Sequence, residues 1–131
     1  MKTLKSESFT PEYIQNALFY FNDVAHKFHL DTKSFAEHKT LNELYKNLIE
    51  FKDNICELIM GYQSGKRIGK LNIEEIPEYS HAESIKLATL IKDFAYELEK
   101  WAEDKKYCDI SNVAQSLSGL GAKTLYFLTL M

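Results

Sequence analysis

Proline and glycine are scarce in this sequence of 131 residues, which contains two prolines and five glycines. Both residues interrupt helices, so their scarcity leaves long stretches free to be helical. The remaining composition, with 45% hydrophobic and 27% charged residues, is ordinary for a globular protein. A chain of this length is long enough for one core and too short for two. We therefore expect a single all-α domain over residues 1–131.

Cysteine is scarce as well, and the sequence has neither a long apolar run nor a strong net charge. Cys56 and Cys108 are too few for a disulfide framework, and no run approaches about 18 consecutive apolar residues. The N-terminal stretch MKTLKSESFTPEY lacks the apolar segment of a signal peptide. The formal net charge of −3 argues against a general nucleic-acid coat, whose affinity comes from neutralising phosphates. These absences favour a reduced, cytoplasmic protein that does not cross a membrane.

The sequence does contain four stretches in which apolar residues recur at helical spacing. They predict helices over about 11–30, 35–62, 81–106 and 110–131. A residue type that caps helix N-termini precedes each stretch: Thr10, Ser34, Ser80 and Asp109.

Glycine marks two further features of this pattern. The connection over 61–80 holds three of the five glycines and one proline, and we expect a short helix in it near 72–76. Gly119 and Gly121 lower the propensity of the last helix, which indicates close packing against another helix. The whole pattern describes a four-helix bundle, and periodicity leaves open whether the bundle is up-down-up-down or contains a crossover.

The second helix has two faces to bury. Projection at about 100° per residue assigns one apolar set to the bundle core: Leu41, Leu44, Leu48, Phe51, Ile55, Leu58 and Ile59. A second set, roughly 130° away, is expected at an interface with another copy of the chain: Tyr45, Ile49, Cys56 and Met60. The same face carries two pairs of residue types that bind metal ions, His38 with Asn42 and Asp53 with Glu57.

The two pairs cannot meet within one chain. Asn42 and Asp53 lie about 16 Å apart at a rise of about 1.5 Å per residue, whereas ligands sit about 2 Å from a metal ion. Two such helices packed antiparallel, about a two-fold axis near Leu48 and Ile49, would bring the first pair of one copy against the second pair of the other. The sequence therefore predicts a homodimer with two inter-subunit sites.

The spacing of these residues resembles that of the Dps-like mini-ferritins, a branch of the ferritin-like superfamily. Their inter-subunit iron site has a His on the first helix, then a His, an acid, an Asp and a Glu at fixed intervals. The same intervals fall here on His26, His38, Asn42, Asp53 and Glu57. The C-terminal AKTLYFLTL, preceded by Asp109, is also similar to the last helix of that family. Lys27 stands where a Trp commonly follows the first His, and the basic N-terminal tail of DNA-binding members is not evident.

The resemblance implies a ferritin-like four-helix bundle with a long central connection between the second and third helices. It also implies a spherical twelve-subunit shell, or a two-fold dimer in a truncated relative, that binds Fe²⁺, oxidises it, commonly with hydrogen peroxide, and stores ferric mineral. The stronger iron position would take His26 from one subunit and Asp53 and Glu57 from another. The weaker position would use His38 and the acid that Asn42 replaces here.

Asn42 decides how much iron chemistry to expect. Its amide offers a carbonyl oxygen but no negative charge, so its affinity for a hard divalent cation is lower than that of a carboxylate. Zn²⁺ could occupy the same mixed ligands and do no redox chemistry. A second interpretation is therefore open: a non-catalytic ferritin-like protein, oligomeric or associated with DNA, whose metal site is degenerate or structural. The basic residues available for a DNA contact are Lys66, Arg67 and Lys70, with Lys2 and Lys5.

Overall fold

The computed structural model describes residues 9–130, so Lys2 and Lys5 lie outside it. Its four helices are α1 (Pro11–Asp31), α2 (Phe35–Tyr62), α3 (His81–Lys105) and α4 (Cys108–Leu128). Residues 9–130 contain no strand, which confirms the expected all-α four-helix bundle. Among these residues, no helix combines the length and the apolar character that a membrane crossing requires.

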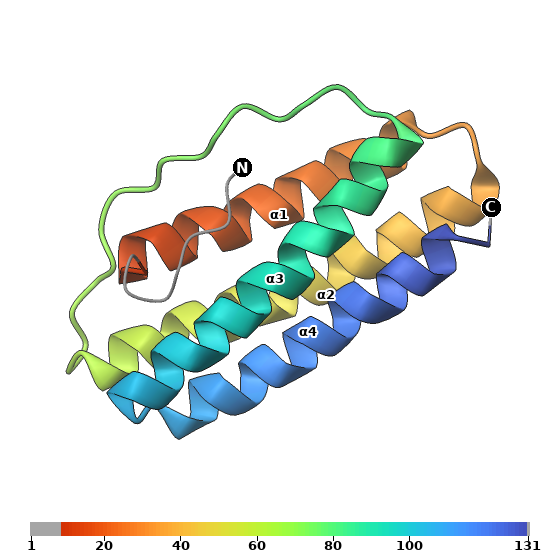
Figure 1. Cartoon of the computed structure of the whole chain (residues 1–131). Coiled ribbons are helices and arrows are strands. Elements are labelled where there is room, and N and C mark those ends of the chain that lie inside the picture. Colours follow the sequence, from red (N-terminus) through yellow and green to blue (C-terminus); the bar gives the residue numbers. More distant parts are fainter. Residues whose placement is uncertain (1–8, 131) are drawn as a thin grey trace.

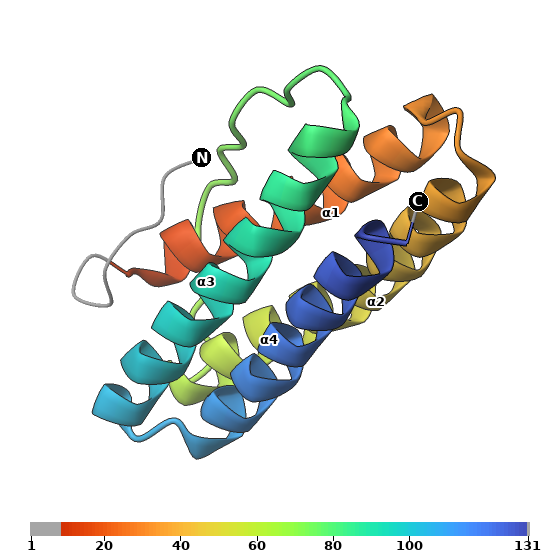
Figure 2. The same cartoon turned by 45° about the vertical axis from the view of Figure 1, so that its right-hand side comes forward.

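The connectivity includes a crossover (Figure 1). α1 and α2 form an antiparallel hairpin, and so do α3 and α4. Between the two hairpins, residues 63–80 run back along the whole bundle, so that α3 starts beside the α1–α2 turn and points in the same direction as α2 (Figures 1 and 2). We call residues 63–80 the crossover; its course excludes the up-down-up-down alternative.

Three of the four expected N-caps are confirmed. The side chains of Thr10, Ser34 and Ser80 each accept a hydrogen bond from the backbone N–H three residues on, at 3.0 to 3.1 Å. These bonds satisfy N–H groups that have no partner inside the helix.

The prediction that Asp109 is the fourth N-cap is wrong. Lys106 takes a left-handed conformation (φ 63°) and Tyr107 N–H donates to the carbonyl of Ala102 at 2.8 Å, so α3 ends and α4 begins within two residues. Tyr107 is therefore the N-cap of α4, without a side-chain hydrogen bond, and Asp109 lies in the first turn. There its carboxylate accepts a hydrogen bond from the Tyr62 hydroxyl at 3.1 Å.

The short helix expected near 72–76 is also wrong, because the crossover is extended there. Its backbone bonds to side chains of α1 rather than to itself: Gln15 Nε2 donates to the carbonyl of Gly69 at 3.2 Å, and Asn72 N–H donates to Asn16 Oδ1 at 2.9 Å. Ile68 of the crossover is 4% exposed and belongs to the core. Contacts with α1 thus override the local helical pattern.

The glycines of α4 differ in what surrounds them. A Cβ at Gly121 would lie 3.0 Å from the backbone nitrogen of Lys92 and 3.2 Å from the carbonyl oxygen of Ala88, both in α3. A Cβ at Gly119 would meet nothing within 4 Å. The expected close approach of two helices is therefore confirmed at Gly121 and absent at Gly119.

This contrast gives a matched pair of substitutions. Gly121→Ala forces α3 and α4 apart, and we expect the free energy of unfolding to fall by about 1 to 2 kcal/mol, since overpacking outweighs the gain in helix propensity. Gly119→Ala gains propensity without a clash and should raise that free energy by up to about 1 kcal/mol. Urea unfolding followed by circular dichroism measures both; stabilisation by both variants would contradict the close approach.

Candidate functional site

Four aromatic rings stack in a cluster on the α1–α2 hairpin, where the rings of His26, His29 and Tyr45 form a triangle, with His29 and Tyr45 5.7 Å apart, and His38 stacks on His29. The ring centroids of His38 and His29 lie 4.9 Å apart, those of His29 and His26 5.3 Å, and those of His26 and Tyr45 4.2 Å. The ring planes of neighbours meet at 12° to 27°. Two of the predicted metal ligands, His26 and His38, are thus brought close through His29. We call these four residues the histidine cluster.

Hydrogen bonds determine which ring nitrogens of the histidine cluster carry a proton. Nδ1 of His38 lies 2.6 Å from the carbonyl oxygen of His29, and Nδ1 of His29 contacts the carbonyl oxygen of His26. A carbonyl can only accept, so both Nδ1 atoms donate. A neutral ring that donates from Nδ1 keeps its lone pair on Nε2, and metal-binding histidines commonly donate their other nitrogen to a backbone carbonyl in this way.

Asn22 connects α1 to α2 beside the histidine cluster. This side chain of α1 is 5% exposed, donates from Nδ2 to the carbonyl of Tyr45 at 3.0 Å, and accepts a hydrogen bond from Lys52 Nζ at 3.0 Å. The Lys52 ammonium also lies 4.4 Å from the ring centroid of Phe19. The register between α1 and α2, and with it the stacking of His26 on Tyr45, therefore depends on a buried amide.

The second predicted pair, Asp53 and Glu57, is separate from the histidine cluster. Asp53 and Glu57 are exposed one turn apart on α2 and make no hydrogen bond or ion pair within residues 9–130. Asn42 is half-buried and lies one turn after His38, near the start of α2. Across the described part of the chain, no group of three or more His, Cys, Asp and Glu side chains could hold a metal ion. One copy of the protein thus carries the predicted metal-site residues in two separate groups.

The four residues expected at an interface are not equally available. Ile49 is half-buried, and Tyr45 and Met60 are partly buried against the core of their own chain. Cys56 is 9% exposed and belongs to that core, where burial and then the Asp53 carboxylate raise the pKa of its thiol to about 11. Leu48, expected near a two-fold axis, is fully buried, so of the two residues expected there Ile49 is the one that reaches the surface.

Sequence reasoning missed a buried carboxylate at one end of the bundle. Glu37 is 2% exposed, and its Oε1 accepts hydrogen bonds from Tyr79 at 2.6 Å, His81 Nδ1 at 3.1 Å and Thr32 Oγ1 at 3.3 Å. Burial alone would raise the pKa of Glu37, but the polar groups of Tyr79, Ser84 and His81 outweigh it and hold that pKa below its ordinary value. We call Glu37 and these partners the Glu37 network.

The sequence signal for this network was the N-cap Ser34 followed three residues later by Glu37, and this signal did not indicate where the Glu37 carboxylate lies. Ser34 caps Glu37 as expected, but the Glu37 carboxylate does not return the bond, because Thr32 Oγ1 accepts from Ser34 N–H at 3.2 Å instead. The Glu37 carboxylate therefore lies inside the bundle, where it bonds Tyr79 and His81. The side chain of His81 is 43% exposed, and its Nδ1 bonds Glu37.

The fold and these sites define an all-α, four-helix protein with an imidazole-rich face. A protein-family model described as a family of unknown function, DUF5856, matches residues 29–128. The match covers most of the chain, so the protein belongs to this family. It includes every residue from His29 to Glu57 and begins after His26. Neither a curated protein nor a solved structure matches the chain.

The Glu37 network predicts how stability depends on pH. Because the folded-state pKa of Glu37 is lowered, its contribution is fully present above its ordinary pKa of 4.5 and is lost as the pH falls through the folded value. At pH 7, Glu37→Gln should lower the free energy of unfolding by about 1 to 3 kcal/mol, since charge-assisted hydrogen bonds are lost. The difference between wild type and variant should shrink below about pH 4.5.

Glu50→Gln is the matched control for this measurement. Glu50 is exposed on the same helix and makes no hydrogen bond or ion pair within the described residues, so its loss at pH 7 should cost less than about 0.5 kcal/mol. Chemical denaturation of the three proteins between pH 3 and 7 measures both effects. A gap between wild type and Glu37→Gln that widened in acid would contradict a lowered pKa of Glu37 in the folded protein.

Proposed function

We propose that the protein binds Fe²⁺ between two copies of its chain, as a Dps-like iron-binding and iron-storage protein and a candidate ferroxidase that protects against iron and peroxide. The observation that carries this proposal is the His38 ring, which donates Nδ1 to a backbone carbonyl. This arrangement leaves Nε2 as a ligand atom and fixes the orientation of the ring, as in established metal sites.

Charge on the other half of the face supports the same function. Asp53 and Glu57 project like charges from one turn of α2. A divalent cation relieves that repulsion, and carboxylate oxygens suit Fe²⁺ as well as Zn²⁺. In an antiparallel pair of α2 helices, these carboxylates of one copy would complete a site with His26 of the other. Each chain would then give ligands to two sites.

The connectivity of the bundle also favours this proposal. A single long crossover between two helical hairpins is the arrangement of ferritin-like bundles, whose metal sites use carboxylates and histidines on facing helices. In ferritin-like chemistry Fe²⁺ is a substrate. Reduction of one hydrogen peroxide to two waters consumes two electrons and two protons, and two Fe²⁺ ions supply the electrons.

Asn42 favours a second candidate function, an oligomeric protein with a degenerate or structural metal site. Without a carboxylate at this position, the site nearer to His38 lacks a negative ligand for a second cation. One ion per site would then bind without efficient two-electron chemistry, and Zn²⁺ would serve as well as Fe²⁺. A DNA contact at Lys66, Arg67 and Lys70, all exposed where the crossover begins, belongs to this second candidate.

Native mass and anaerobic Fe²⁺ titration test the inter-subunit site directly. We expect a dimer or larger assembly that binds Fe²⁺, and about tenfold or greater loss of affinity in the double variant Asp53→Asn/Glu57→Gln, which loses two ligands. Glu50→Gln, an exposed acid outside the site, should bind like the wild type. A protein that stays monomeric with and without Fe²⁺ would overturn the proposal.

Oxidation of Fe²⁺, followed by absorbance after adding peroxide, separates the two candidates. Oxidation by the wild type, faster in Asn42→Asp, is the result expected of a ferroxidase. Activity that appears only in Asn42→Asp supports the degenerate site instead.

A further inference from the structure

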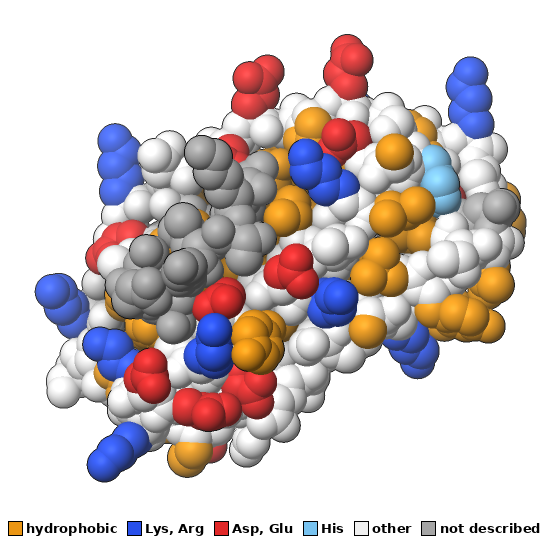
Figure 3. Space-filling view, viewed as in Figure 1, with side chains coloured by type: hydrophobic (Ala, Val, Ile, Leu, Met, Phe, Trp, Pro, Cys, Tyr) orange, Lys and Arg blue, Asp and Glu red, His pale blue; other side chains and the backbone are white. Residues whose placement is uncertain are grey.

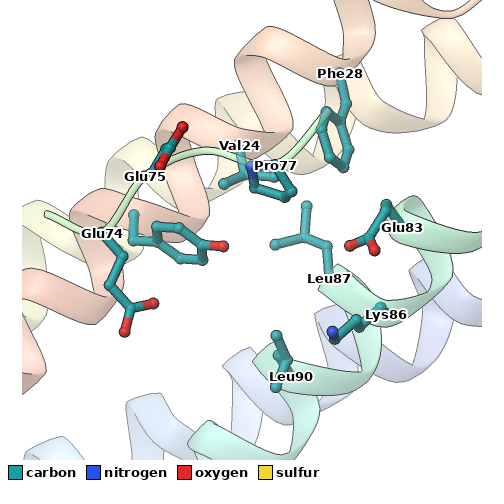
Figure 4. A pocket seen from close by; sticks show the side chains of 10 residues that line it. Val24, Phe28, Glu74, Glu75, Pro77, Glu83, Lys86, Leu87 and Leu90 are labelled. Atoms are coloured by element: carbon teal, nitrogen blue, oxygen red, sulfur yellow. The ribbon is translucent and has the colours of Figure 1, made fainter. Parts of the chain in front are cut away.

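A small pocket lies where the crossover passes over the groove between α1 and α3 (Figure 4). Its volume is about 170 Å³. Val24 and Phe28 from α1, with Leu87 and Leu90 from α3, give it an apolar floor (Figure 4). A cavity of about 150 Å³ is large enough for a benzene molecule, so this pocket has room for an apolar body of that size.

Tyr20 is the buried polar group of this pocket. Its side chain is 6% exposed and lines both this pocket and a second one of about 200 Å³ farther along the crossover. Its hydroxyl makes no hydrogen bond within residues 9–130, and the hydroxyl oxygen is not fully enclosed by the protein, so it can be reached from the pocket. A phenol can both donate and accept, so it is available to a bound molecule.

The charge around the Tyr20 hydroxyl is negative. Glu74 of the crossover and Glu83 of α3 line the pocket, and after burial they are the causes that raise the pKa of Tyr20. Figure 4 shows the Glu83 carboxylate turned toward the pocket, and Figure 3 shows acidic side chains along the edge formed by the crossover. Lys86 is the one cationic residue among those that line the pocket, and it forms no ion pair within the described part of the chain.

We propose that this pocket binds a small organic cation, namely a primary ammonium group on an apolar body of about four to seven carbons. The apolar body lies on the floor formed by α1 and α3. The ammonium group, with three N–H donors, faces the Glu83 carboxylate and the Tyr20 oxygen (Figure 4). This site is separate from the proposed iron site and does not depend on it, since it uses none of the same residues.

The same arrangement disfavours other ligands. A carboxylate ligand would face the Glu83 carboxylate, with Lys86 as the cationic residue among the described residues that line the pocket, and a neutral alcohol would gain no charge attraction from Glu83. A divalent metal ion is disfavoured too, because no cluster of three metal-binding side chains occurs in the described residues.

Three ligands of equal chain length provide the test on the intact protein. Ligand-observed NMR and calorimetry with n-butylammonium, n-butanol and butyrate at low salt should give binding in that order, with the ammonium at least about fivefold tighter than the alcohol. Equal binding of the ammonium and the alcohol, tighter binding of butyrate, or no binding of n-butylammonium would each overturn the proposal.

Charge-neutralising variants on α3 predict shifts of opposite sign. Glu83→Gln should weaken n-butylammonium binding by about fivefold, whereas Lys86→Gln, one turn away, should strengthen it by about twofold. Tyr20→Phe should weaken binding while leaving thermal unfolding unchanged, because the hydroxyl it removes has no internal hydrogen bond. Tyr126→Phe, at a tyrosine 59% exposed on α4, is its control. Shifts of the same sign at Glu83 and Lys86, or no shift at either, would contradict the charge argument.

Discussion

Glu37 keeps a negative charge inside the protein, and the groups that make this tolerable come from three other segments. A buried carboxylate is costly unless its oxygens are hydrogen-bonded. Thr32 follows α1, Tyr79 ends the crossover and His81 begins α3, and all three bond to Oε1 of Glu37, whereas Oε2 is buried without a hydrogen bond in the described residues. These contacts place the start of α3 beside the start of α2. Because α2 ends at the opposite end of the bundle, the crossover has to span its whole length. The pocket under the crossover and the uncovered outer face of α1 and α2 both follow from that.

Local sequence signals predicted the parts of the fold that local interactions determine. Thr10, Ser34 and Ser80 cap their helices because a side-chain oxygen three residues before a free N–H is sufficient for the bond. Asp109 and the segment 72–76 were predicted wrongly for the opposite reason. The start of α4 depends on the left-handed turn at Lys106, and the extended crossover depends on side chains of α1 more than 50 residues away in the sequence.

The candidate metal face was predictable as a set of residues and not as an arrangement. Helical periodicity put His38 and Tyr45 on one face of α2, but it could not show that the His29 ring of α1 contacts the rings of His26, His38 and Tyr45. His29 lies three residues after His26, a spacing that places both on one helix face, and the family spacing gave it no role. Cys56 was assigned to the same face as Tyr45, yet it lies in the core, because the width of a buried stripe depends on the neighbouring helices.

The crossover also shapes how this fold can form and diversify. Each hairpin closes between helices that are neighbours in the sequence, so the core needs only one long-range closure, the docking of one hairpin on the other. The entropy of closing that loop rises only with the logarithm of its length. Exposed residues of the crossover can therefore be exchanged, and residues added to it, while the four helices keep their packing, whereas Ile68 and Tyr79 contact the core and Glu37. The fold thus combines four tightly packed helices with a crossover whose exposed residues can change to recognise different ligands.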